Sequence, residues 1–132
     1  RPASPRPEAS VVQARATLDE SSLFDRFGQD SDLIMTALEN YRSEWQDLIR
    51  PMSAALEADD LDSLTRHAHS IRGVAATISG VAVTDLALAI ETRARHGERD
   101  GLEAQIALME QQARQLSDAA ARLLERLPHP GV

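Results

Sequence analysis

Residues 61–78 read LDSLTRHAHSIRGVAATI, and the apolar side chains in this stretch recur at helical spacing. They follow one another in steps of three or four, in the order Leu61, Leu64, Ala68, Ile71, Ala75 and Ile78. Residues at these steps lie on one face of an α-helix, so the stretch predicts a helix with one buried stripe. The acidic pair Asp59-Asp60 directly before it can cap its first turn.

Three other segments show the same period. The preceding segment begins at a cap, Asp30 or Ser31, and its stripe is Ile34, Leu38, Tyr41, Trp45, Leu48, Met52 and Ala55. The following segment has the stripe Val83, Leu86, Ile90 and Ala94. The last covers residues 102–127, and Asp100 and Glu103 before it have the spacing of a capping box. Because no segment alternates with period two, we expect an all-α fold, an antiparallel up-and-down four-helix bundle.

A short additional N-terminal helix is expected around Leu23, Phe24 and Phe27. Before it, residues 1–10 hold three prolines and few apolar side chains, which is typical of a linker. We therefore divide the chain into a linker or tail at 1–19, a helical domain at 20–127 and a C-terminal tail at 128–132.

Composition excludes several classes of function. The 132 residues include no cysteine, so neither disulfides nor thiolate chemistry is available. A net charge of -7 argues against nucleic-acid binding, which needs a cationic surface. No run of apolar residues is long enough to span a membrane, so we expect no direct membrane contact. The four histidines lack the HExxH pattern and other helical metal spacings, and we expect no metal site.

The histidine that stands out is His69, on the helix expected at residues 61–78. On a helical wheel it lies roughly 130° from the centre of the apolar stripe, whereas His67 lies roughly 70° away, at the boundary. An exposed imidazole is a plausible nucleophile, since free histidine has a pKa of about 6.5 and is largely neutral at pH 7.

The neighbours of His69 on the helix are unusual. Gly73 lies one turn further on and faces outward, although an exposed glycine costs a helix about 0.5–1 kcal/mol relative to alanine. With Ala76 one more turn along, it leaves the imidazole clear for another protein to approach. Arg72 puts a cation beside anything anionic held on the ring. Two readings remain open from spacing alone: a reactive site, or a surface histidine beside a glycine that relieves helix packing.

The segment Ala68-His69-Ser70-Ile71-Arg72-Gly73 resembles the signature of histidine phosphotransfer (HPt) domains, which is a histidine, any residue, an aliphatic, a basic residue and a glycine. The resemblance continues through the flanking helices over roughly residues 20–127. It implies a four-helix bundle with an extra N-terminal helix, and a function as a phosphorelay intermediate of two-component signal transduction. Such a domain accepts a phosphoryl group from a receiver-domain aspartate and passes it to the receiver aspartate of a response regulator.

The resemblance also implies a role for each matching residue. His69 would be phosphorylated on Nε2, and Arg72 would stabilise the phosphate. Gly73, Ala76 and Arg66 would lie on the face that docks the receiver. Glu91 matches a polar position, often glutamine, that hydrogen-bonds Nδ1 in some members. As a carboxylate it would orient His69 and stabilise positive charge on the ring, but it would also add negative charge near the phosphate.

The chain departs from the family pattern in two places. Ser79 takes the position of a second glycine found in many members, with Gly80 one residue later. Val74 and Ala76 occupy positions where small residues are usual. Val74, Ala76, Leu23 and Phe24 are candidates for an apolar docking patch, although we favour Leu23 and Phe24 as a cap on the core.

Partners and context follow from the same resemblance. The partners would be the receiver domains of a response regulator and of a parent hybrid sensor histidine kinase, of which this would be the C-terminal module. The domain would be a cytoplasmic monomer, free or as the cytosolic part of an inner-membrane sensor kinase. It needs no cofactor, because Mg²⁺ is expected on the receiver. It is no enzyme, since it has no glycine-rich phosphate loop for ATP.

Two alternatives have different functions. One is a non-catalytic helical docking or dimerisation domain that keeps the fold without turning over phosphate. The other is a helical enzyme with a metal or acid–base site, against which stands the lack of convergent ionisable residues on the inward stripes. Phosphoryl transfer to His69 separates the relay from both.

Overall fold

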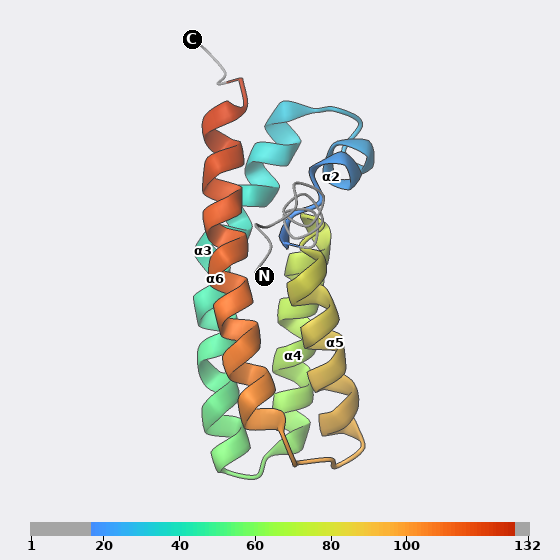
Figure 1. Cartoon of the computed structure of the whole chain (residues 1–132), viewed down its shortest axis with the longest axis vertical. Coiled ribbons are helices and arrows are strands. Elements are labelled where there is room, and N and C mark those ends of the chain that lie inside the picture. The colour runs from blue at the N-terminus through green and yellow to red at the C-terminus, as the bar shows by residue number, and fades with distance from the viewer. Residues whose placement is uncertain (1–16, 129–132) are drawn as a thin grey trace, which may run out of the picture.

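The structure, a computed structural model, describes residues 17–128, which are helical apart from short turns. A short helix precedes four long ones, in the order α2 (Glu20–Arg26), α3 (Ser31–Glu57), α4 (Leu61–Thr77), α5 (Val81–Arg95) and α6 (Leu102–Arg126). The long helices run alternately down and up, and α2 lies beside the end of the bundle where α4 turns into α5 (Figure 1). The predicted all-α bundle with an additional N-terminal helix is confirmed. Residues 1–16 of the expected linker, and residues 129–132 with His129, lie outside the described residues.

The core forms along the predicted stripes. Each long helix packs against two others, through the pairs α3–α4, α4–α5, α5–α6 and α3–α6. The deepest side chains include Tyr41, whose hydroxyl donates a hydrogen bond of 2.9 Å to the carbonyl of Ala113. Burial raises the pKa of Tyr41 above its usual value. No helix within the described range is long and apolar enough to cross a membrane.

At two positions of the predicted stripes, a neighbouring residue is buried more deeply than the predicted one, although the predicted one still packs against the core. In α3, Ile49 is buried in place of Leu48, which is half-buried. In α5, Ala87 is buried in place of Leu86, which is also half-buried. Steps of three and of four both fit a period of 3.6, so periodicity alone does not choose between neighbouring residues. Packing against the other helices makes the choice.

The helix starts follow acidic caps in the first half of the chain. Asp30 accepts hydrogen bonds from the backbone of Asp32 and Leu33, and Asp60 accepts one from Ser63. The capping box expected at Asp100 is wrong, since α6 begins after Gly101 with no side-chain cap. Gly101, with a φ of 81°, is itself the N-cap residue and has no side chain that could accept a hydrogen bond from the first turn.

The turn between α4 and α5 fixes the end of the helix that carries His69. Ser79 has a φ of 59°, the left-handed conformation for which glycine is the usual residue. Its carbonyl accepts a hydrogen bond of 2.9 Å from the backbone of Asp19, and its hydroxyl donates one of 3.1 Å to Ser22. The end of α4 is therefore closed by a serine that is tied to the start of α2.

Helix α2 also contributes to the core. Leu23 is completely buried and Phe24 is half-buried against the core, which supports the interpretation that they cap the bundle. The core reaches back to Leu18, which is only 4% exposed. The Arg26 guanidinium donates to the carbonyl of Ala76 and so joins α2 to the last turn of α4.

Candidate functional site

The packing of α4 turns His69 outward. Ala68 and Ile71, on either side of it, are both completely buried. The His69 side chain therefore points away from the core and is 65% exposed. His67 is half-buried, so both orientations predicted from the helical wheel are confirmed.

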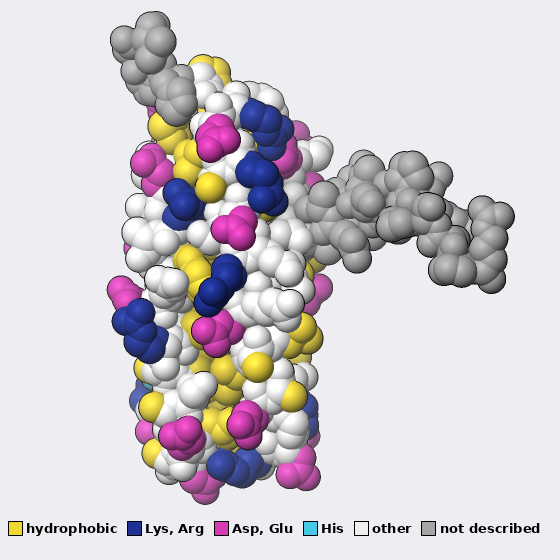
Figure 2. All heavy atoms as spheres, turned by 60° about the vertical axis from the view of Figure 1, so that its left-hand side comes forward, with side chains coloured by type: hydrophobic (Ala, Val, Ile, Leu, Met, Phe, Trp, Pro, Cys, Tyr) yellow, Lys and Arg dark blue, Asp and Glu magenta, His cyan; other side chains and the backbone are white. Residues whose placement is uncertain are grey.

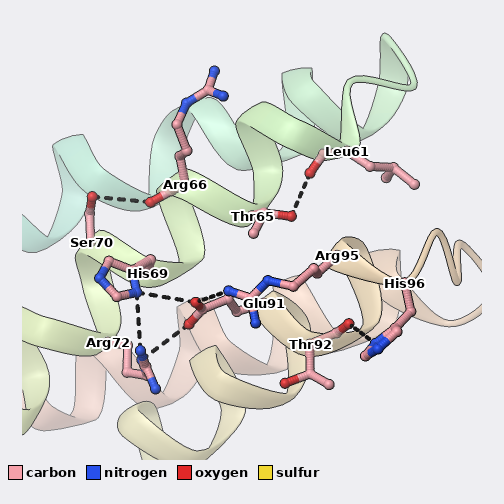
Figure 3. A network of polar contacts seen from close by, with 10 residues as sticks. All are labelled: Leu61, Thr65, Arg66, His69, Ser70, Arg72, Glu91, Thr92, Arg95 and His96. Atoms are coloured by element: carbon pink, nitrogen blue, oxygen red, sulfur yellow. Dashed lines mark hydrogen bonds and ion pairs between the residues drawn. The ribbon is translucent and has the colours of Figure 1, made fainter.

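Helix α5 brings a carboxylate to the inner side of the imidazole. Glu91 follows the completely buried Ile90, and its side chain is only 3% exposed. Its Oε2 lies 3.1 Å from Nδ1 of His69, across the contact between α4 and α5 (Figure 3). Nε2, the other ring nitrogen, has no hydrogen bond to any described residue.

Two arginines complete the cluster around this carboxylate. From α4, Arg72 places Nε 3.1 Å from Oε1 of Glu91 and Nη2 3.0 Å from Nδ1 of His69. From α5, Arg95 donates a hydrogen bond of 2.6 Å from Nη2 to Oε2 of Glu91. Arg95 was not among the residues predicted for the site, although its place four residues after Glu91 is the spacing of an ion pair on one helix.

The two contacts of Nδ1 exclude each other as hydrogen bonds. A guanidinium nitrogen only donates, so Nδ1 can accept from Arg72 only when it carries no proton. A carboxylate only accepts, so Nδ1 can bond to Glu91 only when it is protonated. In the neutral ring, the Glu91 bond leaves a lone pair on Nε2, whereas the Arg72 bond places the proton there. The tautomer of His69 therefore decides whether its exposed nitrogen is a nucleophile.

The environment of Glu91 keeps its carboxylate ionised. Burial favours the neutral acid, but hydrogen bonds from His69 and Arg95 and the charge of Arg72 outweigh it. The pKa of Glu91 consequently lies below the usual glutamate value. At neutral pH the cluster is a buried anion held between two guanidinium groups.

The surface around the imidazole is a depression rimmed by cations. Arg66, Arg72 and Arg95 line it together with His69 and the buried Glu91. Leu88 also lines it and is 44% exposed, although the sequence did not single it out. On the side formed by α3 and α6, by contrast, acidic and basic side chains are interspersed (Figure 2). The exposed charge beside His69 is positive on a chain that is acidic as a whole.

The glycine one turn beyond His69 has no role in packing. A Cβ added to Gly73 would have no atom of another group within 4 Å. This excludes the interpretation that Gly73 relieves contact between helices. Ala76, one turn further, is half-buried, while Arg66 is exposed and points away from the four-residue cluster in Figure 3.

His96 and the acidic residues of the described range form no second metal or acid–base site. His96 is exposed, and its Nδ1 lies 2.8 Å from the carbonyl of Thr92 in its own helix. Between residues 17 and 128, no group of three histidine or acidic side chains is arranged to hold a metal ion.

Comparisons with known proteins bear on the family and the fold. The Hpt domain family matches residues 36–126 of the chain. The fold is similar to that of histidine-containing phosphotransfer protein B from Pseudomonas aeruginosa PAO1, with a TM-score of 0.77 and 24% identity. That similarity covers 85% of this chain and 97% of the other. No curated protein matches the sequence. Since the family match covers more than half of its length, the chain belongs to the Hpt domain family and is a phosphorelay intermediate of two-component signal transduction, a phosphocarrier rather than a kinase.

Proposed function

We propose that His69 carries the phosphoryl group, on Nε2, between the aspartates of two receiver domains. The observation that supports this most strongly is the contact of 3.1 Å between Nδ1 and Oε2 of the buried Glu91. A proton on Nδ1 directed at Glu91 leaves the Nε2 lone pair facing solvent, where a partner can reach it. Glu91 thus orients the histidine.

The transfer step balances without a cofactor on this chain. The Nε2 lone pair attacks phosphorus in line, an N–P bond forms, and the P–O bond to the aspartate breaks with its electron pair leaving on the carboxylate. The ring gains positive charge, which the Glu91 carboxylate stabilises. Onward transfer reverses these steps: the receiving aspartate attacks, and the N–P electron pair returns to the ring. Mg²⁺ would be held by the receiver and would supply positive charge for the phosphoryl oxygens.

Arg72 stabilises the phosphoryl group in this proposal. Its guanidinium lies 3.0 Å from Nδ1 and is 31% exposed, so it is partly free to turn toward an anion on the ring. The Glu91 carboxylate would add negative charge near the phosphate, and Arg95 offsets that charge. The phosphoryl group would meet a site whose exposed charges are positive.

The receiver would dock on the face around His69. Gly73 leaves that face open, and Ala76, one turn further, adds only a small side chain to it. Arg66 adds a cation at its rim. Leu88 adds an exposed apolar side chain in the same depression. The charge is complementary to a phosphorylated aspartate and the acidic residues that bind Mg²⁺ beside it.

The wider context is proposed on the same basis. The bundle, with the buried Leu18 included in its core, acts as a monomeric module in the cytoplasm. It serves as the C-terminal part of a hybrid sensor kinase, and takes phosphate from the receiver of that kinase for a separate response regulator. Phosphorylation from ATP occurs in another domain.

The test is transfer from phosphorylated receivers. Receiver domains encoded in the source organism are phosphorylated with labelled acetyl phosphate and Mg²⁺, then mixed with the wild type, His69→Gln or His67→Gln. We expect acid-labile, base-stable label on the wild type and on His67→Gln, and none on His69→Gln. Label that persists in His69→Gln, or a wild type that no receiver labels, would contradict the proposal and favour a docking domain without phosphate turnover.

A further inference from the structure

The position of Glu91 raises a chemical difficulty for a nucleophilic histidine. A buried carboxylate 3.1 Å from an imidazole stabilises the doubly protonated ring. In that form Nε2 carries a proton and has no lone pair to attack phosphorus. A carboxylate placed to orient His69 would therefore also tend to inactivate it, unless other charges oppose protonation.

Arg95 is placed to oppose this second protonation of the His69 ring. Its Nη2 and the Nδ1 of His69 approach the same oxygen, Oε2, at 2.6 and 3.1 Å. Arg72 places Nε 3.1 Å from the other oxygen, Oε1, as an ion pair, although Oε1 accepts no hydrogen bond. Two cations and one anion leave a surplus of positive charge next to the ring, and a second ring proton would add to it.

The Arg95–Glu91 pair differs from an ordinary exposed ion pair on one helix. The same pair of residue types at the same spacing occurs on α6, where Arg114 lies 4.0 Å from Glu110 and both side chains are more than half exposed. Such exposed pairs on one helix contribute about 0.3–0.5 kcal/mol. The pair on α5 differs because Glu91 is buried and already contacts His69 and Arg72.

We propose that Arg95 is a positioning residue for phosphoryl transfer, which acts through Glu91. By balancing the carboxylate together with Arg72, it lets Glu91 hold the proton on Nδ1 without drawing a second proton onto Nε2. The inference rests on the proposed role of His69 and adds a residue to which the sequence pattern assigned none. The other charged group lining the depression, Arg66, lies outside these contacts.

The experiment measures the His69 ring directly. Long-range ¹H–¹⁵N spectra of the ¹⁵N-histidine protein report tautomer and protonation between pH 5 and 9. They are recorded for the wild type, Arg95→Gln, Arg95→Lys and the matched control Arg114→Gln. The His69→Gln spectrum assigns the signal.

In Arg95→Gln, we expect the second ring proton to bind at a pH higher by about half a unit to one unit, as for loss of one partly solvated charge near the ring. Arg95→Lys restores most of the wild-type profile, and Arg114→Gln leaves it unchanged. Acceptance of phosphate from phosphoramidate, a small donor that needs no docking, falls several-fold in Arg95→Gln at pH 6, relative to the wild type, and less at pH 8.

Two results would overturn the inference: a His69 titration in Arg95→Gln that matches the wild type, or an equal shift in Arg114→Gln. Circular dichroism establishes that each variant is folded, and Arg95→Met, which also removes the charge, replaces Arg95→Gln if that variant is not. The ring titration needs no phosphorylation, so it tests Arg95 even if receivers fail to label His69. Failure of the relay proposal would appear separately, as an absence of label on the wild type at every pH.

Discussion

Glu91 and His69 are 22 residues apart in the sequence and come from different helices, yet Oε2 of one lies 3.1 Å from Nδ1 of the other. The carboxylate is 3% exposed, whereas the imidazole is 65% exposed. This contact therefore anchors an exposed ring to a buried charge, and leaves the outer nitrogen of the ring free. The reactivity proposed for His69 depends on this contact.

The first prediction concerns the contribution of Glu91 to stability. Glu91→Gln leaves two guanidinium groups without their anion, and we expect it to lower the free energy of unfolding at pH 7 by about 1–2 kcal/mol. The pKa of Glu91 is depressed in the fold, so its contribution is present above the pKa of an unfolded glutamate, about 4.3, and disappears as pH falls through the lower folded value. Urea titrations of both proteins between pH 3 and 8 measure the difference.

Glu110→Gln is the matched control, because it removes an exposed carboxylate at the same distance along a helix from its arginine. We expect a change of about 0.5 kcal/mol or less. A Glu91→Gln protein as stable as the wild type at pH 7, with the same pH dependence, would show that the cluster does not hold an ionised carboxylate.

The second prediction separates two glycines. Gly73→Ala adds a methyl group in open space on an exposed helix face, so it should stabilise the fold by about 0.5–1 kcal/mol. It should nevertheless slow transfer from a phosphorylated receiver, because the methyl group lies on the docking face, and leave acceptance from phosphoramidate unchanged.

Gly80→Ala should instead destabilise the fold. Its Cβ would meet the buried side chain of Leu116, so we expect a loss of about 1–3 kcal/mol from overpacking. Thermal unfolding and transfer rates measure both variants. Equal transfer rates for Gly73→Ala and the wild type would remove the glycine from the docking surface.

The third prediction tests Leu88 as a docking contact. Leu88 beside His69 and Leu108 on α6 are 44% and 45% exposed, which makes them a matched pair. Leu88→Ala should raise the receiver concentration needed for half-maximal transfer several-fold, without changing acceptance from phosphoramidate. Leu108→Ala should change neither. Equal effects of the two substitutions would place the receiver on another surface.

Much of this site could be predicted from the sequence, and the reason is periodicity. The stripe through Ala68 and Ile71 determines which residues of α4 face outward, so His69, Arg72 and Gly73 could be placed on one exposed surface. The contact between His69 and Glu91 on α5 could not be predicted from periodicity. Periodicity orients residues within one helix but does not set the height of one helix against another, so Glu91 was matched only through the family resemblance.

Arg95 and Leu88 were missed for the same physical reason. An arginine four residues after a glutamate is common on helix surfaces, and an exposed leucine is ordinary. Each becomes informative only once α4 and α5 are packed together and the buried carboxylate is seen between them. The capping box expected at Asp100 was a wrong prediction of the opposite kind, a feature expected but not found. Helix α6 begins after Gly101, which has no side chain to cap it.

The fourth prediction concerns Ser79, which occupies a family glycine position with a φ of 59°. Ser79→Ala loses the hydrogen bond to Ser22 and keeps the left-handed strain, whereas Ser79→Gly loses the same bond and relieves the strain. We therefore expect the glycine variant to be more stable than the alanine variant by about 1 kcal/mol, as measured by urea unfolding. Equal stabilities would mean that the turn relaxes out of the left-handed region.

The most direct test of the account is to locate the phosphoryl group on the ring. The ¹⁵N-histidine protein is phosphorylated by a phosphorylated receiver and Mg²⁺, and ¹⁵N–³¹P coupling is measured in long-range ¹H–¹⁵N spectra. The account predicts coupling at Nε2 of His69, with Nδ1 still protonated and bonded to Glu91. Coupling at Nδ1 of His69, or at any nitrogen of another histidine, would contradict it.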